Sequence, residues 1–439
     1  MVESILTGIL SFAWTILSKT AIIWGPILAM YYAFKYWQDF VTDRFISGIQ
    51  WTLLEIEIPR NIEKTPMAME LILTNALYHA SGKGVWEVWV QGAPHFWFSL
   101  EIAGIDGGVH FYIRTPSRIR DLIETQIYAQ YPQAKVKEVE DYTLKVAYDA
   151  PNKDWHVWGT EFKLENHSAY PIKTYKDFGL DKPSDKEQQK IDPITPIIEF
   201  LGSLRRGQQV WIQYIIRPSK LEAGSSPEGE KQGWVGEAYQ ELERLLVPYK
   251  QEMFLSNASQ NAKAGDDVGY QVRPPELVLT RVKKMQEKIQ KLGFDIGIRA
   301  VALSETKYIP LAEFENLRRS FRLLFRQFNN PDLNSIVRYN GTGYDSPWAD
   351  PTGIATWKLK NRMLNWYRMR TFFHPPFWYS FKLHPLLNFI IPFKHDLTIN
   401  VMNVEEIATI YHFPGQVSQT PSFQRVESKV AKPPPNLPI

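Results

Sequence analysis

The chain has 439 residues, of which 50 are basic and 47 acidic, so its net charge is +3 at pH 7, and it contains no cysteine. The lack of cysteine excludes disulfides, thiolate metal sites and cysteine nucleophiles. The near balance of charge excludes the global basic excess that is typical of nucleic-acid-binding proteins. A hydrophobic fraction of 44% and an aromatic fraction of 14% predict a folded chain with two or three domains.

The first 45 residues predict a membrane anchor. Residues 4–37 carry no charge apart from Lys19 and Lys35. Residues 20–37, with their flanks, are long enough to cross a bilayer, which needs about 20 residues. Residues 4–17 are short for a span and predict an interfacial helix or a hairpin partner. A single transmembrane helix over about 20–38 places the chain in the cell membrane; a cleaved signal peptide and a buried soluble helix are the alternatives.

Residues 46–150 predict a first α+β domain. Alternation in the string LEIEI and in the two strings around the turn GIDGG indicates strands with one buried face. Apolar stripes at helical spacing follow Thr65-Pro66 and Pro116. The expected order is strand 54–58, helix 67–80, strands 85–90, 97–102 and 109–113, helix 116–130 and edge strand 134–139. Segregated helices over an antiparallel sheet are the pattern of a ferredoxin-like α/β sandwich.

A similar order returns in residues 151–330, which predict a second α+β domain. The expected elements are strand 155–164, helix 192–204, strand 209–217, helices 234–246 and 276–292, strand 294–303 and helix 310–328. The repeat is one of element order, not of letters, and raises a duplicated unit as a hypothesis. A basic, aromatic-rich region follows at 331–414, and residues 415–439 predict a proline-rich tail or linker.

No motif in the sequence predicts catalysis. The string GSSPEGEK at 224–231 approximates a phosphate-binding loop but has Glu230 in place of the required lysine, and no strand is expected before it. Neither a zincin helix motif nor a nucleophile elbow occurs, and the histidines match no metal-ligand spacing. We therefore expect no enzyme activity, no catalytic residue, no cofactor and no metal.

Two groups of basic residues are candidates for a binding surface. One is an arginine cluster on the helix at 310–328, and the other lies in residues 351–395, which contain no Asp or Glu but many aromatic side chains. Cations interleaved with aromatic rings suit single-stranded nucleic acid and equally an anionic membrane surface; a subdomain packed on its own aromatics is the third interpretation. The candidate nucleic-acid or lipid surface consists of Arg318, Arg322, Arg326, Lys358, Lys360, Arg362, Trp366, Arg368 and Arg370.

Several strings together resemble a known family. They are LEIEIPRNIEKTPMAMELIL (54–73), WFSLEIAGIDGGVHFYIRTP (97–116), LIETQIYAQYPQAKVKEVEDY (122–142), DPITPIIEFLGSLRRGQQVWIQYIIRP (192–218) and EEIATIYHFPG (405–415) with SKVAKPPPNLP (428–438). Their order is similar to the region that precedes the P-loop motor in membrane-anchored conjugation ATPases of type IV secretion systems. In that family the string resembling PPPNLP leads into the nucleotide-binding domain, which this sequence does not include.

The resemblance implies a membrane-anchored, non-catalytic scaffold or adaptor of a type IV secretion or conjugation-like DNA-transfer system. It implies a cytoplasmic α+β region, a separate P-loop ATPase and other secretion-system subunits as partners, and a homo-oligomer. The alternative function is binding of nucleic acid or of an anionic membrane surface through residues 351–395.

Overall fold

The computed structural model describes residues 2–59, 64–79, 85–148, 154–181, 192–219, 233–260, 274–343, 350, 352–374 and 399–415, without the side chains of 2–18, 21–24, 85, 88, 250–260 and 322. The chain divides into two compact units. Unit 1 consists of Met1–Ile49, Gly82–Pro94 and Phe373–Lys394, and unit 2 of Gln50–Ser81, His95–Phe372 and His395–Ile439. The predicted tail at 415–439 and the loop at 224–231 lie outside the described residues, apart from Gly415.

Unit 1 is built on helix α1 (Val2–Ser47), which includes Pro26. A short helix, α3 (Val85–Trp89), follows in the second segment of the unit, and its Trp89 ring stacks on Phe34 of α1 with ring centroids 5.3 Å apart. The prediction of a strand at 85–90 is wrong, because a strand needs a ladder partner and this segment packs against a helix. None of the helices, over the residues described, is long and apolar enough to cross a membrane; the side chains of 21–24, within the predicted span, are outside that description.

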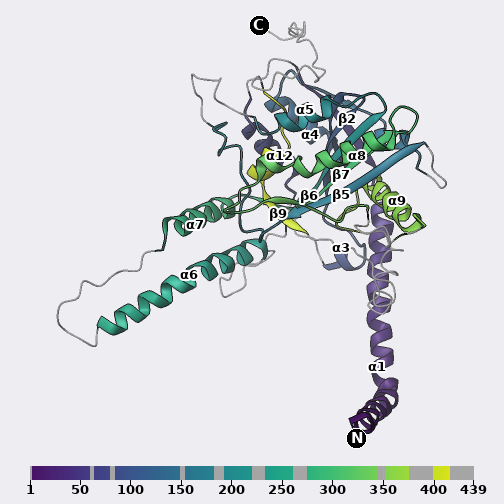
Figure 1. Cartoon of the computed structure of the whole chain (residues 1–439), viewed down its shortest axis with the longest axis vertical. Helices are drawn as coiled ribbons and strands as arrows, with labels where there is room; N and C mark the ends of the chain where they lie inside the picture. Colours follow the sequence, from purple (N-terminus) through teal and green to yellow (C-terminus); the bar gives the residue numbers. More distant parts are fainter. Residues whose placement is uncertain are drawn as a thin grey trace. The chain divides into compact units, whose positions relative to one another are not determined.

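Unit 2 is an α+β fold around one antiparallel sheet, as the sequence predicts (Figure 1). Its first half runs β1 (Trp51–Glu57), α2 (Met67–Ile72) with the π-helical turn η1 (Leu73–Leu77), β2 (Phe98–Ile105), β3 (Gly108–Pro116), η2 (Ser117–Ile119), α4 (Arg120–Gln130), β4 (Lys135–Glu138) and η3 (Tyr142–Lys145). The β2–β3 turn is Asp106-Gly107, both with positive φ, as the type I′ hairpin requires. The strands lie in the order β4-β1-β3-β2.

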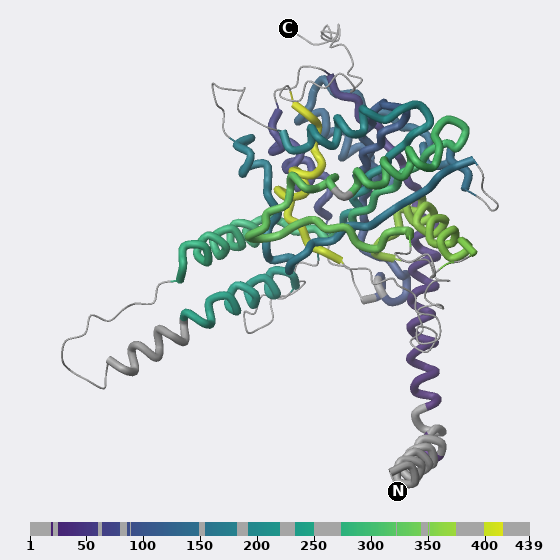
Figure 2. The backbone as a smooth tube through the Cα atoms, in the orientation of Figure 1, coloured from purple at the N-terminus to yellow at the C-terminus, as the bar shows by residue number. Residues whose placement is uncertain are grey.

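The second half repeats this connectivity. It runs β5 (Trp155–Leu164), α5 (Thr195–Gly202), β6 (Gln208–Pro218), α6 (Gly233–Gln260), α7 (Glu276–Ile289), β7 (Gly293–Glu305), α8 (Leu311–Ser320), η5 (Phe321–Leu323), η6 (Arg326–Phe328) and β8 (Ile336–Tyr339). Its strands lie in the order β8-β5-β7-β6, the counterpart of β4-β1-β3-β2. Helices α6 and α7 are inserted between β6 and β7 and run side by side (Figure 2).

Strands β2 and β6 pair along their full length and join the two halves into one continuous sheet. The ranges predicted as two domains therefore contribute strands to a single sheet. The region predicted at 331–414 adds β8, helix α9 (Ile354–Met369), strand β9 (Asn400–Asn403) and helix α12 (Val404–Ile410). Strand β9 pairs with the first residues of β7, on the edge of β7 where β5 pairs with the later residues.

The two faces of the sheet are covered differently. Helices α2, α4, α5, α8 and α12 cover one face and enclose the main hydrophobic core (Figure 1). Helix α9 and the η3 segment cover the other face, where a smaller core contains Tyr142, Trp211, Met363 and Tyr367. Alternating strand residues point to opposite faces, so the side that LEIEI leaves polar is also partly buried.

Candidate functional site: a polar row under helix α9

A row of polar residues crosses the whole sheet on the face covered by α9. Residues that pair directly across antiparallel strands share a face, so the strand register defines the row. It consists of Lys137, Glu55, Tyr112, Glu101, Gln213, Arg299, Glu161 and Tyr339, on β4, β1, β3, β2, β6, β7, β5 and β8 in that order. We call these eight residues the polar row.

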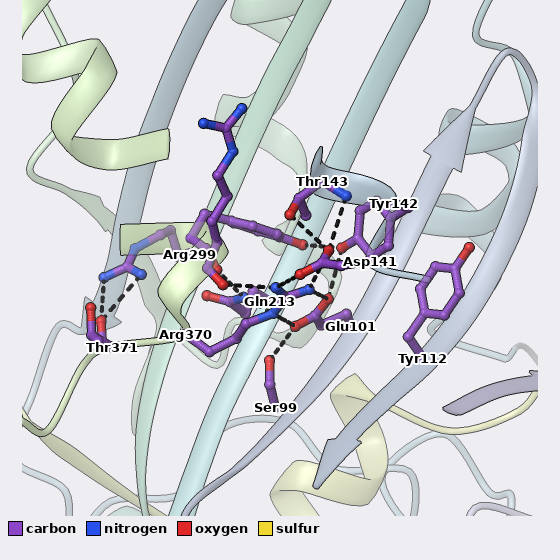
Figure 3. Close-up of polar contacts among 12 residues, drawn as sticks. Ser99, Glu101, Tyr112, Asp141, Tyr142, Thr143, Gln213, Arg299, Arg370 and Thr371 are labelled. Carbon is purple, nitrogen blue, oxygen red and sulfur yellow. Dashed lines mark hydrogen bonds and ion pairs between the residues drawn. The ribbon is translucent and has the colours of Figure 1, made fainter. Parts of the chain in front are cut away.

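Glu101 is the centre of the row, and its side chain is fully buried. Its Oε1 accepts hydrogen bonds from Arg370 Nε at 2.9 Å, Ser99 Oγ at 2.6 Å and Gln213 Nε2 at 3.1 Å. Its Oε2 accepts from Tyr142 OH at 2.8 Å and Arg370 Nη2 at 3.1 Å. Five donors therefore satisfy both carboxylate oxygens, as Figure 3 shows for the contacts around Glu101.

Arg370 lies at the C-terminal end of α9, and its side chain extends from that helix to the row. It is the C-cap residue and has a left-handed backbone with φ of 51°. Its guanidinium bridges Glu101 and Asp141, with Nη2 donating to Asp141 Oδ1 at 3.1 Å and Nη1 contacting the other carboxylate oxygen. Its carbonyl accepts from Trp97 Nε1 at 3.0 Å. The left-handed turn thus directs this side chain down onto the sheet.

A second buried arginine, Arg299, belongs to the same row. Arg299 on β7 donates to Glu161 Oε1 on β5 from Nη2 at 2.7 Å and from Nε at 3.2 Å. The guanidinium is also 3.4 Å from the carbonyl oxygen of Thr371. The chain after α9 is therefore held by both buried arginines, one in it and one beneath it (Figure 3).

Two glycines allow the segment to approach this closely. A Cβ added at Gly297 would lie 2.4 Å from Phe372 Cγ, and one at Gly159 would lie 2.6 Å from Met363 Cγ. Real side-chain carbons do not approach to such distances. Glycine on the two adjacent strands β5 and β7 is therefore a condition for the docking of α9.

The electrostatics of the row favour the charged pair. Burial alone would raise the pKa of Glu101, but the charge of Arg370 and the hydrogen bonds received lower it below its ordinary value of 4.5. The same opposing causes lower the pKa of Asp141. Burial and the Glu101 charge raise the pKa of Tyr142 and Tyr367 well above the ordinary value. At neutral pH the carboxylates are charged and the tyrosines are protonated.

The central carboxylate of the row is engaged by the fold itself. A general base needs a free acceptor within reach of a substrate proton, whereas the oxygens of Glu101 are all engaged with the fold. Among the described residues, no cluster of His, Asp and Glu is placed to hold a metal ion. The chemistry that the row supports is recognition within the chain, which locks α9 onto the sheet.

Only some residues of the predicted basic surface are exposed to solvent. Arg370 and Trp366 are buried, which corrects their place in the candidate set, because a side chain inside the fold cannot contact a nucleic acid or a lipid. Arg368 donates to the carbonyl oxygen of Val146, and Arg362 stacks over Trp366 with its guanidinium carbon 5.2 Å from the ring centroid. Most of these cations thus serve the packing of α9.

The remaining candidates are spread over two elements. Lys358 and Arg326 are exposed, Lys360 is partly buried, and Arg318 forms an ion pair with Glu315 at 2.6 Å. The side chain of Arg322 and residues 375–395 lie outside the described part of the chain. Lys360 and Arg318 are the two that line one cavity.

Sequence reasoning missed the polar row. It interpreted alternation in β1 and β2 as a sign of one solvent-facing side. The available signal was a lone charged or amide residue within a strongly apolar strand, as in FSLEIA, WIQYII and IGIRAVA. Burying such a group without a partner is costly, so each of these strings indicates a polar partner elsewhere in the fold.

A third buried ion pair fixes the C-terminal elements. Lys288 Nζ on α7 is 2.8 Å from Glu406 Oε2 on α12, and both side chains are fully buried. Glu406 also forms a capping box with Asn403, and His412 Nε2 lies 3.0 Å from Asp192 Oδ1. Strand β9 and helix α12, drawn in yellow in Figure 2, are thereby held to the rest of unit 2; we call these two elements the C-terminal clamp.

Comparison with known proteins gives one match. No curated protein and no solved structure matches the chain. The model of a family described as a domain of unknown function, DUF8128, matches residues 82–338, which include β2 to β8 and the polar-row residues Glu101, Gln213 and Arg299. This match covers more than half of the 439 residues. The chain therefore belongs to the DUF8128 family.

Proposed function

We propose that this chain is a membrane-attached, non-catalytic scaffold of a type IV secretion or conjugation-like DNA-transfer machine. In this function unit 1 contacts the membrane, and the sheet of unit 2 faces the cytoplasm and holds a separate P-loop ATPase. Other subunits of the machine and further copies of this chain are its remaining partners.

The observation that carries the proposal is the apolar surface of unit 1. Met30 is 73% exposed and Trp86 67% exposed. The further exposed apolar side chains of the unit are Ile27, Leu28, Tyr31, Phe34, Trp37, Phe40, Trp89 and Val90. Soluble monomers rarely leave such a set uncovered. Tryptophan and tyrosine are also the residues that collect at membrane interfaces.

The segment around α3 belongs to this surface. Its backbone packs against α1 so closely that a Cβ on Gly92 would lie 2.6 Å from the backbone nitrogen of Thr42. Trp86 and Trp89 stay exposed while the adjoining Gly92 is buried. A short helix held on a long one through the Trp89–Phe34 stack, with Trp86 largely exposed, supports a contact with the membrane interface.

The absence of catalysis in the proposal is supported by the polar row, whose central carboxylate is saturated by donors from the fold. The secretion part of the proposal rests on the resembling strings, which contain β2, β3, β4, α5 and β6 and most of β1, α4 and α12. In the resembled family the string that resembles PPPNLP leads into the motor domain. The repeated connectivity of the two halves supports an origin by duplication of one unit.

The proposal is tested by flotation of the full-length chain in liposomes with a purified P-loop ATPase of the secretion type from the same genome. We expect the chain to resist carbonate extraction and the ATPase to float only when the chain is present. A chain that is released by carbonate contradicts the membrane part. An ATPase that stays at the bottom beside a floating chain contradicts the scaffold part.

The alternative, a nucleic-acid or lipid surface at residues 351–395, retains few accessible groups among the described residues. On α9, Lys358 is exposed, and Arg362 is partly exposed where it stacks over Trp366. If they contact single-stranded DNA, each removed cation should reduce the log–log salt slope of binding by about 0.7. Equal slopes for the parent chain and a Lys358→Ala, Arg362→Ala variant contradict this alternative.

A further inference from the structure

A cavity of about 240 Å³ opens beside the first part of β5. Strand β8 pairs with β5 at residues 161–164, and further along that edge the backbone nitrogen of Thr342 donates to the carbonyl oxygen of Gly159 at 2.9 Å. Its lining includes His156 and Trp158 of β5, Phe314, Glu315 and Arg318 of α8, Lys360 of α9, and Thr342 and Asp350. Helices from both faces of the sheet thus meet around one edge.

Both carboxylates in the cavity are already engaged. Glu315 Oε2 accepts from Arg318 Nε at 2.7 Å and lies 2.6 Å from its Nη2. Asp350 accepts from the backbone nitrogens of Thr356 at 2.6 Å and Ala355 at 3.3 Å, at the start of α9. Neither carboxylate forms an ion pair with Lys360.

Lys360 supplies a positive charge to the cavity. Within the described structure its ammonium group has no hydrogen bond and no ion pair. Burial and the neighbouring Arg318 lower its pKa, with only partial compensation from Glu315. A partly buried cation without a partner is unfavourable, and an anion placed beside it removes that cost.

Two further donors border the same space. Thr342 Oγ1 accepts from the backbone nitrogen of Gly159 at 2.9 Å, which leaves its hydroxyl hydrogen to donate. His156 stacks on Phe314 with ring centroids 5.4 Å apart, and a neutral imidazole carries one N–H donor. Trp158 and Phe314 supply apolar walls.

We propose that this cavity binds a phosphate monoester with an apolar body, whose phosphate contacts Lys360, Thr342 and His156 while the body packs on Trp158 and Phe314. Lysine is a point-charge donor that suits phosphate. The volume suits one small ligand and not a polymer. This site is independent of the proposed scaffold function, since it lies wholly in unit 2 and involves no membrane or ATPase contact.

The test is calorimetric titration of the full-length chain in detergent with phenyl phosphate, and separately with inorganic phosphate, benzoate and phenol. We expect phenyl phosphate to bind most tightly and phenol not to bind. Lys360→Met should weaken phenyl phosphate binding by about 10- to 100-fold, the size of a lost charge-assisted hydrogen bond. Lys358→Met, on the exposed side of the same helix, should bind like the parent.

A folding control separates a lost site from a lost fold. Because Lys360 is partly buried without a partner, Lys360→Met should keep or raise the melting temperature while losing the ligand. Thr342→Val is a second variant and should weaken binding about 10-fold. Binding that is absent in the parent chain, unchanged in Lys360→Met, or stronger for benzoate than for phenyl phosphate overturns the proposal.

Discussion

The two units of this chain depart from the usual distribution of polarity in opposite ways. Unit 2 buries ionised groups between the sheet and α9, where Arg370 and Arg299 are fully enclosed. Unit 1 leaves large aromatic side chains in solvent. In unit 2 the unusual groups have partners inside the chain, so they specify the fold. In unit 1 the described exposed aromatic groups are those that the proposed membrane contact would cover.

The largest effect is expected where the buried partners are removed one at a time. Arg370→Met leaves Glu101 and Asp141 without their shared cation, and breaking a buried pair in this way costs about 3–5 kcal/mol. We expect a loss of this size in the free energy of unfolding measured with urea. Arg326→Met, which changes an exposed arginine, should stay within about 0.5 kcal/mol.

Replacing both partners sharpens the same point. A double variant, Arg370→Met with Glu101→Gln, should lose less stability than the sum of the two single variants, because neither charge is then left alone. Additive losses in that double-mutant cycle would show that the two groups act independently. They would contradict the role of the pair in fixing α9.

The fold could be predicted from the sequence further than the site. Alternation, proline and glycine indicated β1, β2, β3, β5, β6 and β7 and most of the helices on the main face, because those signals are local. The pairing of β2 with β6 and the docking of α9 are not local, since they join residues such as Glu101 and Arg370 that are 269 positions apart. The predicted basic surface included Arg370 because the charge of a residue does not indicate whether the fold brings a carboxylate to it.

A smaller loss of stability is expected when the segment after α9 is pushed away from the sheet and its ion pairs are kept. A Cβ on Gly297 would overlap the Phe372 ring, and overpacking of this kind costs about 1–3 kcal/mol. Gly297→Ala should lower stability by that amount. The matched control is Gly343→Ala, whose added Cβ meets nothing within 4 Å. If Gly297→Ala is as stable as the control, α9 is not tightly seated.

Acid should weaken the row in a direction that the pKa shifts determine. The pKa values of Glu101 and Asp141 are lowered in the folded chain, mainly by Arg370 acting against burial. Their contribution to stability is therefore present above the unfolded pKa values near 4 and is lost as pH falls through the folded ones. Urea midpoints should decline below about pH 4, and Glu101→Gln should make that decline shallower. A steeper decline in Glu101→Gln contradicts this assignment.

The smallest effect on stability, and the clearest contrast with the row, is expected in unit 1. Trp86 is 67% exposed, so Trp86→Ala should change the melting temperature little, since exposed substitutions cost within about 0.5 kcal/mol. The same variant should bind liposomes more weakly, because each large apolar side chain buried in the interface contributes about 1.5–3 kcal/mol. Leu144→Ala, an equally exposed apolar residue of unit 2, should leave liposome binding unchanged. A Trp86→Ala variant that floats like the parent but melts earlier would place this ring in packing within the chain and remove it from the membrane contact.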